Sequence, residues 1–155
     1  MANKIRIITV GKAHDAKLRE AIADYEQRLA PTKVVWHVLP PKTEASVAET
    51  IASESYAIAS TLKEAEYIVV LDERGETLTS EAFSAKIISA LATHKDFSFV
   101  IGGAYGVNDA VRKRANLVVC FGKMVFPHQL MRLMLIEQLY RAASIANGSK
   151  YHHGG

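Results

Sequence analysis

The chain has 155 residues, of which 49% are hydrophobic and 23% are charged, and its formal net charge is +3. This length and apolar content predict one globular domain, residues 1–155, with a sizeable core. A single cysteine excludes a disulfide framework, no Cys/His cluster has zinc spacing, and no segment has the length and apolarity of a membrane span. The sequence opens directly on a strand pattern without a signal peptide, so we expect a cytoplasmic protein.

The charge is unevenly distributed along the chain. Residues 112–155 carry seven Lys or Arg and one acid, a net charge of +6, whereas residues 1–111 carry twelve basic and fifteen acidic side chains, a net charge of −3. A basic terminal third indicates a polyanionic partner, although a solvated charged surface explains the same numbers.

In chain order, apolar runs alternate with segments of helical spacing. Strands are predicted at 4–10, 34–39, 67–71, 97–101 and 117–121, and helices at 15–29, 47–62, 80–93, 108–114 and 128–147. The central strands are continuous apolar runs, which is typical of a parallel sheet covered on both faces. The sequence therefore predicts an α/β fold.

Ligands of such a fold lie beyond the carboxyl ends of the strands. Three loops leave those ends in the second half of the chain, at 71–75, 102–106 and 121–126. We expect the functional site where these loops meet.

The last expected helix is apolar on more than one side, and Pro127 suits its first turn. One side carries Leu130, Leu133, Met134 and Leu139, and another carries Met131, Leu135 and Ala142. A surface helix needs only one apolar stripe, so this helix either passes through the core or meets another subunit.

The glycine-rich segment 101–106 lets the backbone approach a ligand closely, but a tight turn explains it equally well. It is neither a P-loop, which needs Gly-Lys-Ser/Thr, nor a dinucleotide fingerprint after the first strand. The sequence also lacks a Gly-x-Ser-x-Gly elbow, and Cys120 lies in an apolar strand where an inert thiol is expected. An ordinary Rossmann-type methyltransferase is disfavoured because Gly-Lys-Ala-His follows the first strand.

Several motifs stand in a recognisable order: Val10-Gly11-Lys12, Gly102-Gly-Ala-Tyr-Gly106, the run from Phe121 to Arg132, Glu137-Gln-Leu-Tyr-Arg141 and Tyr151-His152. Together they closely resemble the bacterial large-subunit rRNA pseudouridine N3-methyltransferases, the small single-domain members of the SPOUT class. The resemblance covers the whole chain and is most specific between residues 121 and 141. The chain departs from the family at its end, where His-Gly-Gly follows Tyr-His.

The resemblance implies a parallel-sheet SPOUT fold whose C-terminal segment forms a trefoil knot, and a homodimer that uses the last helix. It also implies S-adenosylmethionine bound by the knot loops. Carried over by position, the cofactor contacts are Leu71, Gly102, Phe121, Gly122, Lys123, Met124, Val125 and Phe126. Apolar side chains and backbone groups of this kind can enclose an adenine without an acidic ribose ligand.

The activity implied by the resemblance is direct methyl transfer to N3 of a pseudouridine in 23S rRNA, without a metal or a covalent intermediate. The residues expected on the substrate side are His128, Arg132, Arg141, Tyr151 and His152. The arginines would hold a phosphate or a base carbonyl, a histidine would accept the N3 proton, and the tail would close over the partner subunit's cofactor pocket. Because the chain lacks a separate RNA-binding module, the assembled ribosome is the expected substrate.

Structural roles compete with these assignments. His128 can cap the last helix, Arg132 and Glu137 can form ion pairs at a dimer seam, and the final residues can be a frayed terminus. The adjacent His152 and His153 lack a third metal ligand. Two other functions stay open: a non-catalytic RNA-binding protein, which the intact 121–126 loop disfavours, and a metabolic nucleotide enzyme, which the basic terminal third disfavours.

Overall fold

A computed structural model describes residues 4–152 of the protein. Its strands are β1 (Lys4–Val10), β2 (Lys33–Leu39), β3 (Tyr67–Thr77), β4 (Phe97–Ile101) and β5 (Leu117–Cys120). Its helices are α1 (Ala16–Arg28), α2 (Val47–Thr61), α3 (Ser80–Leu91), α4 (Asp109–Arg114) and α5 (His128–Ala146). Each predicted element is present, and every end except the carboxyl end of β3 lies within two residues of the prediction.

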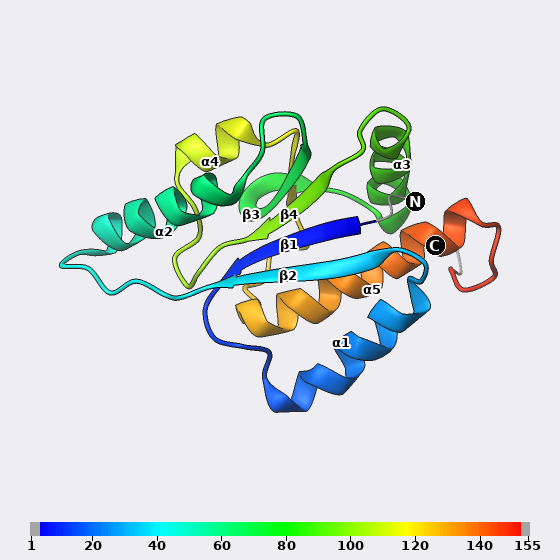
Figure 1. The fold of residues 1–155 in the computed structure, drawn as a ribbon, viewed down its shortest axis with the longest axis horizontal. Helices are drawn as coiled ribbons and strands as arrows, with labels where there is room; N and C mark the ends of the chain where they lie inside the picture. The colour runs from blue at the N-terminus through cyan, green and yellow to red at the C-terminus, as the bar shows by residue number, and fades with distance from the viewer. Residues whose placement is uncertain (1–3, 153–155) are drawn as a thin grey trace.

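All of these strands are parallel and form one sheet in the order β2-β1-β4-β3-β5 (Figure 1). Because side chains alternate along a strand, each strand contributes to both faces. Ile5 and Ile7 of β1 join the core beneath α1, α3 and α5, whereas Ile8 and Val10 join a second core beneath α2 and α4. The predicted α/β class is confirmed.

Polar N-caps fix where the shorter helices begin. Asp15, Ser46, Thr79 and Asn108 each accept a backbone N–H of the first turn of α1, α2, α3 and α4, respectively. Such a bond stabilises a helix by about 1 kcal/mol. The start of α5 instead has Pro127 at the cap and no side-chain capping bond, so His128 does not serve as a cap.

The predicted turn at 72–75 is wrong in one respect, because β3 continues to Thr77. Leu71 and Glu76 both pair with Val119 of β5, so the intervening residues form an irregular excursion within the strand. A Cβ at Gly75 would lie 2.6 Å from the backbone of Val118, which shows how closely the excursion packs on β5. The alternation of apolar and polar residues in the sequence cannot predict that a strand leaves its partner strand and then pairs again with the same residue, here Val119.

At the amino end of the central strands, a buried ion pair joins Arg6 of β1 to Glu66, with 3.0 Å between Nη1 and Oε2. Ser98 of β4 donates to the same Glu66 oxygen, and the Lys63 backbone N–H donates to Oε1 at 2.7 Å. Every oxygen of this buried carboxylate is therefore satisfied.

The buried face of α5 explains its apolar sequence. Leu135, Ile136 and Leu139 have no exposed surface, and neither does Arg132. Leu133 and Met134 lie on the other side and are only partly covered. Passage of the C-terminal segment through a loop stays a prediction. Within residues 4–152, no helix has the length and apolarity to cross a membrane.

Candidate cofactor and substrate site

The carboxyl edge of the sheet holds a cavity of about 750 Å³, which we call the knot-loop cavity. Its walls come from the excursion in β3, the glycine loop after β4 and the loop between β5 and α5. The structure brings together here every residue expected to contact the cofactor: Leu71, Gly102, Phe121, Gly122, Lys123, Met124, Val125 and Phe126. His128 also lines this cavity.

The glycine loop has no room for side chains at its start. A Cβ at Gly102 would lie 2.9 Å from Val107 Cγ1 and 3.0 Å from the Gly106 carbonyl carbon. Gly106 has φ +81°, a conformation that side chains disfavour. The Gly106 N–H donates to the Gly103 carbonyl at 3.1 Å, so the loop is a tight turn, and it also lines the cavity. The ligand-binding interpretation of its glycines stays a prediction.

An ion pair fixes this loop to the excursion in β3. The Arg112 guanidinium lies 3.5 Å from Asp72 Oδ2 and also donates to the Val107 carbonyl. The Asp72 side chain is almost fully buried. Sequence analysis missed this pair, because a single Asp after a strand and a single Arg on a short helix give no local signal.

Two apolar side chains at the rim of the cavity are open to solvent, beside the charged Glu73, Arg74 and Lys123. Met124 is 77% exposed and Val125 is 90% exposed, which is unusual for such side chains. Cys120, by contrast, is buried, and its thiol donates to the Gly122 carbonyl. The cysteine therefore helps to shape the loop, as expected of an unreactive thiol.

His128 and Arg132 lie close together on the first turns of α5. A Cβ at Gly11 would lie 3.0 Å from His128 Nε2 and 3.4 Å from Arg132 Nη2, so both side chains pack against the backbone at Gly11. Burial, together with the nearby Arg132 charge, lowers the pKa of His128 below its ordinary value of 6.5. Its imidazole is therefore neutral at neutral pH and can accept a proton.

Arg132 is fully buried, yet it has no acidic partner in the described part of the chain. Its Nη1 donates to His14 Nδ1 at 3.2 Å, and its Nε and Nη2 have no hydrogen-bond partner there. Glu137 pairs within the chain with Arg141, at 2.6 Å. Ion pairs of Arg132 and Glu137 across a dimer seam stay a prediction.

The remaining substrate-side residues gather at the far end of α5. The Tyr151 hydroxyl donates to Glu137 Oε1 at 3.1 Å, and Arg141 lies over the Tyr151 ring, 5.0 Å from its centroid. Arg141 Nη1 donates to His152 Nδ1 at 2.9 Å, and His152 Nε2 lies 2.9 Å from Glu81 Oε1. The tail is therefore docked, not frayed; His153 and the Gly-Gly end lie outside the described residues.

Within one chain, the two groups of substrate-side residues are far apart. Arg132 and Arg141 are separated by nine positions of one helix, or about 14 Å along its axis. The tail packs on α1 and α3, away from the glycine loop. One chain therefore does not bring all five residues to the knot-loop cavity.

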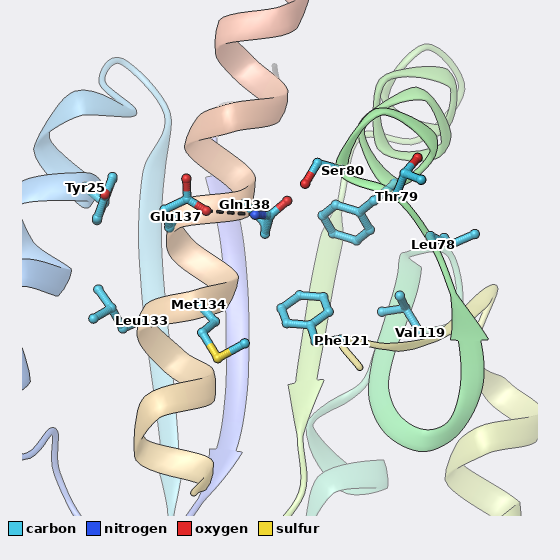
Figure 2. Close-up of a pocket in the computed structure, with 11 residues that line it drawn as sticks. Tyr25, Leu78, Thr79, Ser80, Val119, Phe121, Leu133, Met134, Glu137 and Gln138 are labelled. Carbon is cyan, nitrogen blue, oxygen red and sulfur yellow. Dashed lines mark hydrogen bonds between the residues drawn. The ribbon is translucent and has the colours of Figure 1, made fainter. Parts of the chain in front are cut away.

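A smaller pocket of about 350 Å³ lies beside α5 (Figure 2). Met134 and Gln138 of α5 face Val119 and Phe121 across it, whereas Leu133 lies on the side of α5 towards Tyr25. Val119 and Phe121 also line the knot-loop cavity, so these two residues form the boundary between the two spaces. In the part of the chain that the structure describes, no group of three or more His, Cys, Asp or Glu side chains could hold a metal ion.

Comparison with known proteins places this geometry in a family. The profile described as "Predicted SPOUT methyltransferase" matches residues 3–152. The chain belongs to the SPOUT methyltransferase family. It is 41% identical to the ribosomal RNA large subunit methyltransferase H of Streptococcus suis strain 05ZYH33, over 96% of this chain and 99% of that protein. A protein of the same name from Lactobacillus delbrueckii subsp. bulgaricus is 43% identical, over 96% of this chain and 98% of that protein.

A solved structure supports the family fold. A probable methylase family protein from Haemophilus influenzae Rd KW20 superposes with a TM-score of 0.60 over 99% of this chain and 71% of that chain. At 14% identity this likeness concerns the fold alone. Family membership makes the chain a methyltransferase.

Proposed function

We propose that the protein uses S-adenosylmethionine to methylate N3 of a pseudouridine in large-subunit rRNA, on the assembled ribosome. The observation that carries the proposal is that the eight residues expected around the cofactor line one cavity in a SPOUT methyltransferase. The relatives named as large-subunit rRNA methyltransferases, which match nearly the full length of the chain, support the choice of RNA.

The knot-loop cavity fits such a cofactor. Gly102 is buried and lines the cavity, and the absence of a Cβ lets Val107 and Gly106 pack against it, so the loop turns tightly along the cavity wall. Leu71 and Phe121 offer apolar surface, while backbone groups of the 121–126 loop can read the edge of a purine. When bound, the cofactor supplies a sulfonium methyl group, whose C–S bond breaks as a C–N bond forms at N3.

The chain's own contribution is to orient the base and take up its proton. His128 lines the cavity and is held neutral by burial, so its ring can receive the proton that leaves N3, directly or through water. Arg132 lies beside it with two unused N–H groups, which suits a phosphate or a base carbonyl. The remaining rate acceleration comes from holding the sulfonium methyl group and N3 in the geometry of the reaction.

The distance between the two groups of substrate-side residues favours a homodimer. We place its seam on the half-exposed side of α5, around the pocket of Figure 2, where Leu133 and Met134 lack a complete cover. A second chain there would bring Arg141, Tyr151 and His152 towards its partner's cavity. Such a seam would also explain why α5 is apolar on two sides.

Calorimetric titration with S-adenosylmethionine, with NAD and ATP as controls, tests the cofactor. Selective binding supports the proposal, and tight binding of NAD or ATP instead refutes it. Transfer of radioactive methyl groups then compares intact ribosomes with protein-free rRNA. Equal methylation of the two would remove the ribosome from the proposal, and cofactor binding without methylation of either would favour a non-catalytic RNA-binding role.

Light scattering at micromolar concentration tests the dimer: a monomer that retains activity contradicts it.

A further inference from the structure

A second cavity, of about 440 Å³, adjoins the knot-loop cavity, and we call it the α2 cavity. It lies between the loop after β1, the segment before α2 and the glycine loop. Four residues line both cavities: Gly103, Ala104, Tyr105 and His128. The wall between the two spaces is therefore one short loop and one imidazole.

The α2 cavity contains a buried carboxylate that is only half satisfied. Glu54 of α2 is 4% exposed, and its Oε2 accepts the Lys42 backbone N–H at 3.1 Å. Its Oε1 has no hydrogen-bond partner among residues 4–152. A buried acceptor without a donor is costly, so such an atom points to a ligand that donates.

Gly103 makes this carboxylate part of the wall. A Cβ at that position would lie 2.6 Å from Glu54 Oε1, so only glycine lets the loop pass this close. His128 lies on the same cavity, and the Glu54 charge acts on its imidazole. One space thus offers an acceptor for an N–H group and, nearby, a neutral base.

We propose that the α2 cavity receives the accepting nucleotide and that Glu54 Oε1 accepts a hydrogen bond from N1–H of its pseudouridine. This inference rests on the proposed function. In uridine, N1 carries the ribose and has no hydrogen. In pseudouridine the ribose is attached to C5, which leaves N1–H free while N3 remains available for methylation.

The positions on the ring suit this arrangement. N1 and N3 flank the same carbonyl carbon, so one base can direct N1–H towards Glu54 while N3 faces His128 and the cofactor side. The exposed Lys12 and Lys42 lie at the rim of the cavity, where ammonium groups can meet the phosphates of the same strand. Glu54 is then the residue that distinguishes pseudouridine from uridine.

The test compares methylation of ribosomes that carry pseudouridine at the accepting position with ribosomes from cells that lack the responsible pseudouridine synthase. In Glu54→Gln, the Lys42 N–H still donates to the amide oxygen, so the amide NH2 group takes the place of Oε1. Two hydrogen-bond donors, this NH2 group and N1–H of the base, would then face each other. We expect the preference of the native protein for pseudouridine to fall by about 10- to 100-fold, the size of one hydrogen bond to a charged group. Glu54→Asp should retain the preference at a lower rate.

Controls separate this inference from the proposed function. Glu49→Gln alters an exposed glutamate of the same helix and should leave the preference unchanged. Cofactor affinity of Glu54→Gln, measured by calorimetry, should equal that of the native protein. Failure of the native protein to bind S-adenosylmethionine or to methylate ribosomes would refute the proposed function. An unchanged preference in folded Glu54→Gln would refute only the role of Glu54.

A substrate-side test covers the case in which Glu54→Gln does not fold. Large-subunit rRNA is ligated with a single N1-methylpseudouridine at the accepting position and assembled into subunits. The native protein should methylate it as poorly as it methylates uridine. Methylation as fast as that of pseudouridine would overturn the inference.

Discussion

Replacing Arg132 with methionine should make the protein more stable and much less active. Arg132 is the largest side chain without exposed surface, and two of its nitrogen atoms have no partner among the described residues. Methionine follows the path of the arginine stem and adds no polar group. The substitution therefore removes a buried charge without opening a large cavity.

The magnitude follows from the contacts of Arg132. Each unpaired buried donor costs about 1–3 kcal/mol, and two are removed. The variant also loses the hydrogen bond from Arg132 to His14, which is 3.2 Å long, and with it about 1.5–3 kcal/mol. We expect a net gain of about 2 kcal/mol in the free energy of unfolding, which for a chain of this size raises Tm by about 4–8 °C. Methyl transfer should fall about 100-fold if Arg132 steadies the base or phosphate in the transition state.

Urea unfolding at fixed protein concentration measures the stability, because concentration matters for an oligomer. Arg141→Met is the matched control: it breaks the ion pair with Glu137 and should give no gain. A destabilised Arg132→Met protein that retains full turnover would refute the reasoning. It would mean that Arg132 is a structural residue whose partners form only in the assembled protein.

Three further outcomes are expected. Gly102→Ala places a methyl group 2.9 Å from Val107 Cγ1, so cofactor affinity should fall by about 10- to 100-fold in calorimetry. Gly148→Ala meets nothing within 4 Å but strains a φ of +70°, so it should lower stability and leave the cofactor affinity unchanged. Because the pKa of His128 is lowered, the acid limb of the methylation rate should lie below pH 6.5 and should disappear in His128→Gln; a limb above pH 7 would contradict its role. The pKa values of His14, His37 and His128 are all lowered from 6.5, mainly by burial, so the unfolded chain takes up protons first as the pH falls. The free energy of unfolding should therefore be level above about pH 7 and should decline below pH 6.5, and a rise in the urea midpoint on acidification would exclude this linkage.

Much of the fold could be predicted because it depends on local patterns. Short runs such as 97–101, apolar except for Ser98, indicate buried strands when they alternate with helical patterns, and helices follow from 3.6-residue spacing and polar caps. The position of the site at the carboxyl edge of the sheet could be predicted as well, because the loops that follow parallel strands all leave the sheet at that edge. The cofactor residues, however, came from the family resemblance and not from spacing.

The rest depends on contacts between distant residues. Glu54 reads as an ordinary helical glutamate until Gly103 is packed against it, and the Asp72–Arg112 pair joins segments forty positions apart. The return of β3 to Val119 also depends on a partner strand. That Arg132 is buried with two nitrogen atoms unpartnered among the described residues is likewise a tertiary property, which the helical spacing of α5 does not reveal.

The buried ion pair between Arg6 and Glu66 has a consequence for how the sheet avoids misassembly. Two of the neighbouring pairs in the sheet, β1 with β4 and β3 with β5, are not consecutive in sequence, because β4 lies between β1 and β3. Ser98 arrives on β4 and shares the Glu66 oxygen that holds Arg6. A competing strand order would leave one of these charges buried without its partner, a defect that costs about 3–5 kcal/mol. The cluster of Arg6, Glu66 and Ser98 therefore makes sheets with another strand order less stable than the native sheet.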